Sequence, residues 1–469
     1  MRRFFLIYFL PLFLLFACGE DKREANNAKH KLLGFLSVNK NIASFGKLDV
    51  KGVLEKSKLD KLPKVGVFMN AFKEIYKYTK IEDSIFFASE SFEGKGMNFY
   101  YLVDISNRDS LVEFFRGMGL TFEEKEALMV YESSQFSIAI DENVCAIGQS
   151  DLGVNIGAKT RQLLMANNEK TTDYAILNKI LSANADMVIG VDLKASFIAM
   201  YGSISSTSEV SNLLDNSFIQ TTVNFNNGEI KLKTENYFSN NLNALSFLKS
   251  SDGVWAQEIV KSSAGLGYAL NLDVGELINF AQKLDPTINE KLSFLQILGN
   301  NSLQDINEFS KIWDGRLAYL VNELPDSQNE MGDFKLFVGL GEGGQQLLEW
   351  FNLLYKEEEF KIKQVKNGVL VTSKLQDDVV DLNSAGDPRF QSFGKKGLTF
   401  FMDFTKLKTL EITEGVNLKN SDELDYAALE MDAQGANLSV FFKDKKRNVL
   451  ELLGETAIES LYANDQIFI

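Results

Sequence analysis

Residues 187–193 read MVIGVDL, an apolar strand that ends in Asp192 and passes at Leu193 into a helical stretch. The same pattern of an apolar strand, one polar residue, Leu or Phe and then a helical stretch occurs four times. The other copies are residues 42–48 (IASFGKL, polar Lys47), 266–272 (LGYALNL, polar Asn271) and 398–404 (LTFFMDF, polar Asp403). This recurrence predicts a chain built from repeated strand–helix units.

The segments between these copies also recur in order. Residues 83–88 and 99–103 form a predicted strand pair, with counterparts at 316–321 and 334–338. Three further pairs of segments correspond between the two halves. They are the predicted helices 110–115 and 346–351, the hairpin strands 136–140 and 360–365, and the hairpins 218–232 and 426–442. Asn227-Gly228 and Asn367-Gly368 are favoured hairpin turns.

The order of these elements predicts a tandem duplication. Its halves are residues 30–255 and 256–469, and the boundary falls at the turn-rich residues 250–253. Short turns between neighbouring strands favour antiparallel pairing. We therefore expect an α+β fold of mostly antiparallel sheets with helices packed on one face, and equivalent places for Lys47, Asp192, Asn271 and Asp403.

The composition excludes several classes of function. The chain has 469 residues and a formal net charge of −15, with 49 Lys and Arg against 64 Asp and Glu. Without a run of basic residues, such a chain is not expected to bind nucleic acid. The chain has one histidine, His30, and two cysteines, Cys18 and Cys145. These are too few for most zinc sites, Ser-His-Asp triads or disulfide frameworks.

The N-terminus indicates export. Residues 4–17 form an apolar run after two arginines, too short to span a membrane but typical of a signal peptide. The run ends in Leu15-Phe16-Ala17-Cys18-Gly19, which resembles the bacterial lipobox. We therefore expect a signal peptide at residues 1–17, lipidation of Cys18 and a polar tether at 18–29, with His30 solvated at its end.

Most other reactive groups have structural interpretations. Cys145 lies in an apolar strand next to Asp141 and Glu142, which disfavours a nucleophilic thiolate. Asp49 and Asp273 follow strands at predicted helix starts, where carboxylates cap free N–H groups. The different polar residues in the four strand copies argue against one shared chemistry. No catalytic, metal-binding or cofactor-binding residue is predicted.

One glycine-rich motif requires a separate interpretation. Residues 339–344 (GLGEGG) match G-x-G-x-x-G after a predicted strand, but no acidic residue ends the following strand, and residues 104–109 make the equivalent turn without glycine. We expect these glycines to serve the turn. Gly341→Ala should then cost on the order of 1 kcal/mol if φ is positive there, and be neutral or mildly stabilising if φ is negative.

Aromatic residues offer few binding platforms. The chain has three tryptophans, of which Trp350 is expected in the core. Trp255 and Trp313 lie near predicted loops and are the candidates for stacking on a sugar.

The lipobox, the acidic tether and the recurring strand–polar–Leu–x–helix units together resemble Bacteroidota lipoproteins that carry the domain of unknown function 4836. The resemblance covers nearly the whole mature chain. It implies an exported, lipid-anchored protein without an assigned activity, and it carries over no catalytic residues. Glu20-Asp21 is similar to the acidic signals that direct some of these lipoproteins to the cell surface.

The sequence therefore predicts a non-enzymatic cell-envelope protein that is anchored through lipid on Cys18, with the outer membrane as the expected location. Its periplasmic or surface orientation is open. Its expected role is to bind an envelope protein or glycan, or to scaffold a complex, without a cofactor. The alternative is a carboxylate-dependent hydrolase that acts on envelope glycans.

Overall fold

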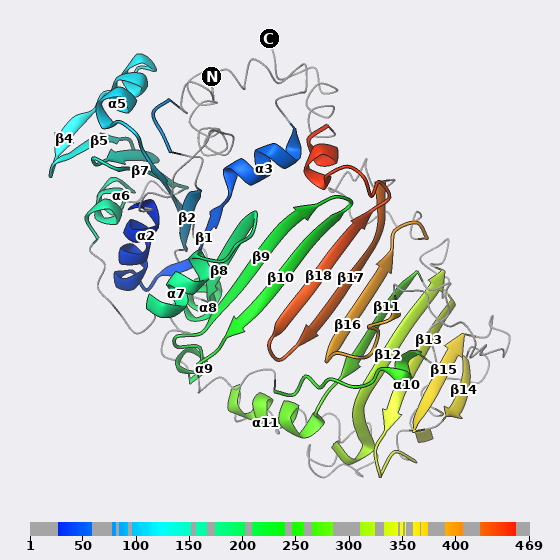
Figure 1. The fold of residues 1–469 in the computed structure, drawn as a ribbon. Helices are drawn as coiled ribbons and strands as arrows, with labels where there is room; N and C mark the ends of the chain where they lie inside the picture. Colours follow the sequence, from blue (N-terminus) through cyan, green and yellow to red (C-terminus); the bar gives the residue numbers. More distant parts are fainter. Residues whose placement is uncertain are drawn as a thin grey trace. The chain divides into compact units, whose positions relative to one another are not determined.

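A computed structural model of the chain describes most of residues 27–455 (Figure 1). The described residues are 27–58, 77–80, 84–91, 96–151, 156–166, 174–201, 209–239, 246–257, 265–284, 310–323, 333–345, 348–349, 352, 360–365, 367–373, 390–406 and 423–455. The predicted signal peptide, Cys18 and most of the tether lie outside them.

The chain divides into two compact units. Unit 1 holds residues 1–227, 234–242 and 446–469, and unit 2 holds residues 228–233 and 243–445. The elements up to the end of the first half are α2 (Asn27–Val38), β1 (Ile42–Leu48), α3 (Val50–Ser57), β2 (Ile85–Ser91), β3 (Met97–Asp104), α5 (Arg108–Gly117), β4 (Glu123–Lys125), β5 (Leu128–Glu132), β6 (Phe136–Ile140), β7 (Val144–Ser150), α6 (Ile156–Met165), α7 (Tyr174–Leu181), β8 (Met187–Asp192), α8 (Leu193–Tyr201), α9 (Glu209–Leu213), β9 (Phe218–Asn226) and β10 (Glu229–Tyr237).

The second half is described less completely. Its elements are α10 (Val254–Gln257), β11 (Leu266–Asn271), α11 (Val274–Leu284), β12 (Trp313–Glu323), β13 (Asp333–Leu340), β14 (Phe360–Val365), β15 (Gly368–Ser373), β16 (Leu398–Asp403), β17 (Leu424–Asp432) and β18 (Gly435–Phe442). Residues 449–455 are helical as well.

The strand order confirms the predicted α+β fold and its duplication. In unit 1 the strands run β4-β5-β6-β7-β3-β2-β1-β8-β9, with antiparallel pairing throughout. In unit 2 they run β14-β15-β13-β12-β11-β16-β17-β18, again antiparallel. From β6 to β9 and from β14 to β17 the two orders match strand by strand.

Neighbouring residues of a strand point to opposite faces of the sheet. The strands of unit 1 carry apolar side chains on both of these faces. Helices α2, α6 and α7 cover one face, over a core that includes Phe45, Phe86 and Leu102. Helices α3 and α5 cover part of the other face, over Ile85 and Val103. The predicted helical layer on one face is present, and the second face carries a smaller layer.

Local sequence explains where these helices begin. Asn107 caps α5 by accepting the Ser110 N–H at 2.8 Å, and Leu111 and Phe115 then point to the core. Helix α2 begins at Asn27, inside the predicted tether of residues 18–29. Its first turn is held by a residue far away in the sequence, because the buried Asp104 carboxylate accepts the Ala28 N–H at 2.9 Å. The tether is therefore shorter than predicted.

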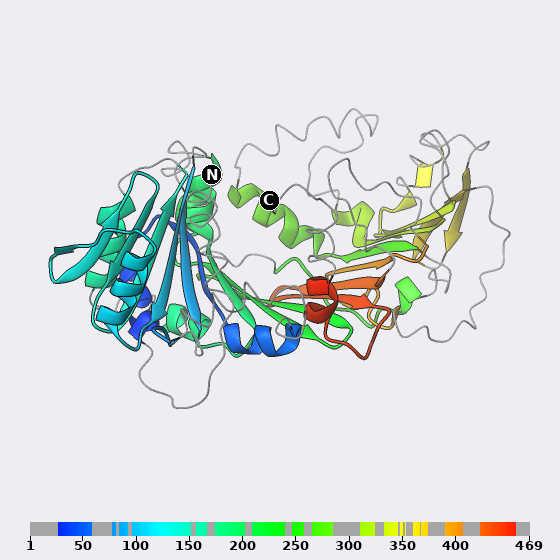
Figure 2. The same ribbon diagram turned by 90° about the horizontal axis from the view of Figure 1, so that it is seen from above.

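In unit 2 the core lies mainly on one face of the sheet. Ala269, Leu320, Phe337 and Phe401 form it together with Phe393 from the turn before β16. Figure 2 shows α11 (light green) on the opposite side of the strands, where it contacts β12. The predicted Asn367-Gly368 turn joins β14 to β15, with Asn367 at a φ of 59°.

The compact units do not follow the predicted halves 30–255 and 256–469. The C-terminal residues 446–469 belong to unit 1, and unit 2 begins at residue 243 apart from its share of β10. The reason is that residues after 445 bind the first half: Asn448 Nδ2 donates to the Phe225 carbonyl at 2.8 Å, and Lys58 Nζ lies 2.6 Å from Glu451 Oε2.

Candidate functional site

The four strand ends fall into two pairs of equivalent positions. Asp192 and Asp403 are equivalent. They pair with Phe218 and Tyr426, and the residue after each aspartate donates its N–H at 3.0 Å to the carbonyl just before that partner, which belongs to Ser217 or Asp425. Each carboxylate caps the following turn, because Asp192 Oδ1 accepts from Ala195 N and Asp403 Oδ1 from Thr405 N, both at 2.9 Å. These side chains therefore have structural roles.

The predicted equivalence of Lys47 and Asn271 is wrong by two residues. Asn271 donates its N–H to the Gly397 carbonyl just before β16, and the residue that does the same before β8 is Asp49, which donates to Asp186. In the first half, Asp49 both follows the strand and caps α3. In the second half Asn271 takes the strand-end position, and Asp273 caps α11 two residues later.

Both predicted caps are confirmed. Asp49 Oδ1 accepts the Gly52 N–H at 3.0 Å, and Asp273 Oδ1 accepts the Glu276 N–H at 3.1 Å. The Lys249 ammonium, 2.9 Å from Asp273 Oδ2, and then the Glu276 amide hold the pKa of Asp273 below its ordinary value.

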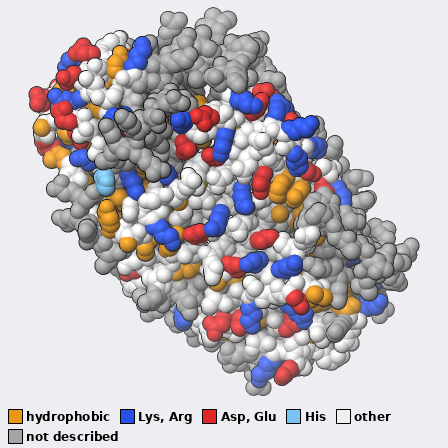
Figure 3. Space-filling view, viewed as in Figure 1, with side chains coloured by type: hydrophobic (Ala, Val, Ile, Leu, Met, Phe, Trp, Pro, Cys, Tyr) orange, Lys and Arg blue, Asp and Glu red, His pale blue; other side chains and the backbone are white. Residues whose placement is uncertain are grey.

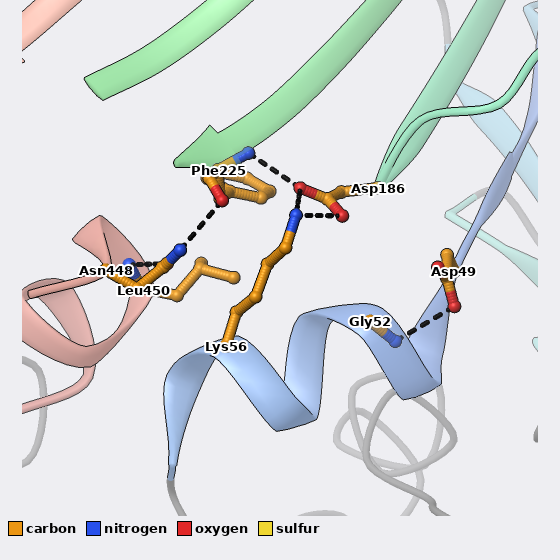
Figure 4. Close-up of polar contacts among 7 residues, drawn as sticks. All are labelled: Asp49, Gly52, Lys56, Asp186, Phe225, Asn448 and Leu450. Carbon is orange, nitrogen blue, oxygen red and sulfur yellow. Dashed lines mark hydrogen bonds and ion pairs between the residues drawn. The ribbon is translucent and has the colours of Figure 1, made fainter. Parts of the chain in front are cut away.

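A buried carboxylate that sequence reasoning missed lies next to Asp49 (Figure 4). The side chain of Asp186, just before β8, is 6% exposed, and Lys56 of α3 donates to both its carboxylate oxygens at 2.6 Å. The Phe225 N–H donates to Asp186 Oδ2 at 2.7 Å. A Cβ added to Gly52 would lie 2.5 Å from Asp49 Oδ2 and 3.4 Å from Asp186 Oδ1, so the two carboxylates flank this glycine.

The contacts around Asp186 continue into the C-terminal segment. Asn448 Nδ2 binds the Phe225 carbonyl, and Asn448 Oδ1 accepts the Leu450 N–H at 3.0 Å at the start of the last described helix. We call Asp49, Lys56, Asp186, Phe225 and Asn448 the Asp186 cluster. It joins α3, the start of β8, the end of β9 and the C-terminal helix within unit 1. As two adjacent carboxylates, its Asp49 and Asp186 are the best described candidates for acid–base chemistry.

The partners of this pair favour a structural role. Asp186 is neutralised by a lysine and bonded to a backbone amide, and Asp49 is engaged by the first turn of α3. In a catalytic pair of carboxyl groups, different environments give the two groups different pKa values, so that one group can act as the acid. Here both carboxylates accept hydrogen bonds from backbone N–H groups, Asp49 from Gly52 and Asp186 from Phe225.

A second buried polar group lies under α6. Glu90 is fully buried and forms an ion pair with Lys159, while Tyr100 Oη donates to Glu90 Oε2 at 3.0 Å. Burial, and then the charge of Glu90, raise the pKa of Tyr100. Asn98 Nδ2 donates to Tyr100 Oη at 3.2 Å, and Asn98 Oδ1 has no partner among the described residues. This network holds α6 on the sheet.

The two remaining reactive residues lie as the sequence indicated. Cys145 is 2% exposed in β7, and burial, with a further contribution from Asp141, raises the pKa of its thiol. The thiol stays protonated at neutral pH and is shielded from reagents. His30 is exposed on α2. Half-buried Lys47 has a pKa lowered by burial and then by the charge of Lys29.

The glycine-rich turn uses its own amides. Gly341 N–H donates to the Ile312 carbonyl and Gly343 N–H to the Lys311 carbonyl, both at 2.8 Å. In a phosphate-binding turn such amides point at the ligand. The φ of Gly341 is not positive, yet a Cβ there would lie 2.3 Å from the Lys311 oxygen. The expectation that a negative φ makes alanine neutral is therefore wrong, because the glycine is required by close backbone approach.

Gly341→Ala and Gly343→Ala form a matched pair for this turn. A Cβ on Gly343 would meet no atom closer than 3.6 Å. We expect Gly341→Ala to lower the free energy of unfolding of unit 2 by about 1–3 kcal/mol and Gly343→Ala to change it by no more than about 0.5 kcal/mol. Denaturant unfolding followed by tryptophan fluorescence measures both. Equal effects of the two substitutions would contradict the close-approach explanation.

The candidate sugar platforms are occupied by packing. The Trp255 ring lies 5.4 Å from that of Phe337, and its Nε1 donates to Ser251 Oγ at 3.3 Å. Trp313 Nε1 donates to the Arg316 carbonyl at 2.9 Å. Trp350 lies outside the described residues. Trp255 and Trp313 therefore stabilise turns of unit 2.

An aromatic pair that sequence reasoning missed lies on β17 and β18. Tyr426 and Phe441 face each other across the strands with ring centroids 4.3 Å apart. Lys445 Nζ lies 5.4 Å from the Phe441 centroid and 2.9 Å from Asp425 Oδ2, so it covers the pair. Strand alternation at Tyr426 and Phe441 was the sequence signal that could have revealed this pair.

On the face of the molecule shown in Figure 3, basic and acidic side chains are interspersed.

Two further properties concern metals and membranes. Among the described residues, no three His, Cys, Asp or Glu side chains are grouped so that they could hold a metal ion. Within the same part of the chain, no helix has both the length and the apolar character needed to cross a membrane.

Comparison with known proteins adds no functional information. No protein-family model and no curated protein matches the chain. Among solved structures, crystal forms III and I of TP0453 align with TM-scores of 0.24 and 0.23 and identities of 8% and 9%. The alignments cover 73% of this chain and 92% and 91% of TP0453. Such low TM-scores carry no argument about fold or function.

Proposed function

We propose that this protein is a non-enzymatic component of the bacterial cell envelope, anchored by lipid on Cys18, which binds an envelope protein or glycan or scaffolds a complex. The lipobox-like residues 15–19 support the anchor. The resemblance to lipoproteins with the domain of unknown function 4836 supports the envelope assignment and an outer-membrane location.

The observation that carries the non-enzymatic part is the engagement of the Asp49–Asp186 pair. Asp186 is bound by Lys56 and by the Phe225 amide, and Asp49 caps α3. A hydrolase needs at least one carboxylate free to exchange a proton with the substrate. The burial of Cys145 and the packing of Trp255 point in the same direction.

Cys18→Ser should release the protein from the membrane fraction. The thiol is the atom that would carry the acyl chains, and several chains are needed for stable anchoring. Membrane fractionation, together with incorporation of labelled palmitate, measures the effect. The control is Cys145→Ser, which changes the other cysteine and should leave both readouts at the wild-type level. A Cys18→Ser protein that stays in the membrane fraction, with no label in the wild type, would refute the anchor.

The alternative is a glycan hydrolase that uses Asp49 and Asp186, since the two carboxylates flank Gly52. The soluble Cys18→Ser protein should then cleave a member of a panel of envelope polysaccharides and aryl glycosides. The proposal requires that it cleave none. Turnover that disappears in Asp186→Asn, with folding retained, would establish the hydrolase instead.

A further inference from the structure

Lys47 is a charged residue at a position where the second half has a core alanine. In the first half Leu48 lies opposite the first residue of β8, and in the second half Leu270 lies opposite the first residue of β16. The residues before them, Lys47 and Ala269, are therefore equivalent. Ala269 is fully buried in the core of unit 2, so the repeated fold does not itself require a lysine at this position.

Lys47 lies on the face of β1 that α2 and α7 cover. It follows Phe45 by two residues, so the two side chains point to the same face. Its partners on the neighbouring strands are Phe86 of β2 and Val188 of β8. Phe45, Phe86 and Val188 all belong to the apolar core on this face. Lys47 is half-buried beside them, so part of its side chain is removed from water.

The charge of the Lys47 ammonium is not compensated by a contact. No hydrogen bond or ion pair joins this ammonium to any residue that the structure describes. Burial lowers the pKa of Lys47, the charge of Lys29 lowers it further, and the charge of Asp49 raises it. The Asp49 carboxylate is engaged elsewhere, because it accepts the Gly52 N–H as the cap of α3. The chain has 64 acidic and 49 basic residues, so a shortage of carboxylates does not explain an uncompensated lysine.

Lys29 brings a second positive charge to the same place. It is half-buried in the first turn of α2, and its ammonium donates to Ser182 Oγ, just after α7, at 2.6 Å. Helix α7 contacts both α2 and β1. Burial lowers the pKa of Lys29 as well. Two half-buried ammonium groups thus act on each other, and a bound anion would stabilise the charged form of both.

We propose that Lys47 and Lys29 bind a phosphate group between the first turn of α2 and the end of β1. The Lys47 ammonium supplies charge-assisted hydrogen bonds from its three N–H groups, and the charge of Lys29 adds to the attraction. A phosphate group presents more charged oxygens than a carboxylate, so it can contact both ammonium groups. The group can be inorganic phosphate or the headgroup of an anionic lipid, because both present the same oxygens. This inference goes beyond the proposed binding role and does not depend on the lipid anchor.

Titration calorimetry of the soluble Cys18→Ser protein with inorganic phosphate at low ionic strength tests the site. We expect saturable binding with a Kd of about 1 mM or lower. Lys47→Met keeps an apolar side chain and removes the charge, so it should weaken binding by about tenfold or more. Lys29→Met should weaken it as well. The matched control is Lys194→Met, at a half-buried lysine of unit 1 whose ammonium lies 2.7 Å from Asp215, and it should leave the affinity unchanged.

Thermal unfolding followed by circular dichroism separates binding from a structural role of Lys47. Without phosphate, Lys47→Met should have the wild-type midpoint or a higher one, because the substitution removes a half-buried charge that has no partner. Phosphate should raise the midpoint of the wild type and leave that of Lys47→Met in place, since only a ligand bound to the folded state stabilises it. A midpoint that falls in Lys47→Met without phosphate would give Lys47 a structural role instead and overturn the proposal.

Vesicles distinguish the two sources of phosphate. The soluble protein is sedimented with vesicles of phosphatidylcholine alone and with vesicles that also contain phosphatidylglycerol. Binding to the second kind that Lys47→Met abolishes and inorganic phosphate competes away would identify a lipid headgroup, and phosphate binding without vesicle binding would identify the free ion. The proposal is overturned if neither probe binds, or if Lys47→Met binds phosphate as tightly as Lys194→Met. None of these results bears on anchoring, which the Cys18→Ser fractionation tests separately.

Discussion

Lys56→Met should lower the free energy of unfolding of unit 1 by about 3–5 kcal/mol, the range for removal of one partner from a buried ion pair. The Asp186 side chain is 6% exposed and would lose both of its 2.6 Å bonds to Lys56. Of its side-chain hydrogen bonds to described residues, the one from the Phe225 amide would remain. The loss exceeds that of a surface salt bridge because water cannot take the place of the ammonium.

The chain contains a separate reporter for each unit. In the Cys18→Ser background, the buried Cys145 of unit 1 is the only thiol, and all three tryptophans fall in unit 2. Thiol labelling in increasing denaturant therefore follows the opening of unit 1, while tryptophan fluorescence follows unit 2. Lys56→Met should shift the labelling transition and leave the fluorescence transition in place.

Asp186→Asn is the control for the charge. The amide oxygen can still accept the Phe225 N–H, and Lys56, with 33% of its side chain exposed, can reach water. The loss should therefore be smaller than for Lys56→Met, and the double variant should regain part of the stability lost in Lys56→Met alone. If Lys56→Met costs less than about 1 kcal/mol, the pair behaves as a surface salt bridge and the assignment is wrong.

Repetition made the fold predictable from the sequence. Alternating apolar residues located β6 and β14, and their shared position within two similar runs of elements indicated the duplication before any contact was known. The two-residue error at Asn271 has a local cause. Lys47 and Asn271 follow similar letters, but the strand register is set by partners on neighbouring strands, and Asp49 combines two roles that Asn271 and Asp273 divide.

Long-range contacts explain what the sequence could not predict. Asp186 and Glu90 look like ordinary polar residues at strand ends, and only their partners Lys56 and Lys159 distinguish them. The same holds for Gly341, whose requirement comes from the Lys311 carbonyl on a distant segment. Local patterns report which face of an element is apolar. They do not report which sheet that face will contact. The C-terminal residues 446–469 cluster with unit 1, whereas the repeats predict that they belong to the second half.

Leu452→Ala tests this assignment of the C-terminal helix, and should lower the free energy of unfolding of unit 1 by about 2–5 kcal/mol. Leu452 is 2% exposed, so alanine would leave a cavity. Residues 446–455 are held to the first half by Asn448 and by the Lys58–Glu451 ion pair, which places this cavity in unit 1. Cys145 labelling in denaturant should therefore shift, and tryptophan fluorescence should not.

Leu453, the next residue along the helix, is the matched control. It is 39% exposed, so Leu453→Ala should change stability by no more than about 0.5 kcal/mol in either reporter. The two variants remove the same atoms from adjacent positions, and they differ only in burial. A Leu452→Ala effect confined to tryptophan fluorescence would return the C-terminal helix to the second half, in agreement with the boundary that the repeats predict. An effect confined to Cys145 would establish that the last segment of the second repeat completes the first.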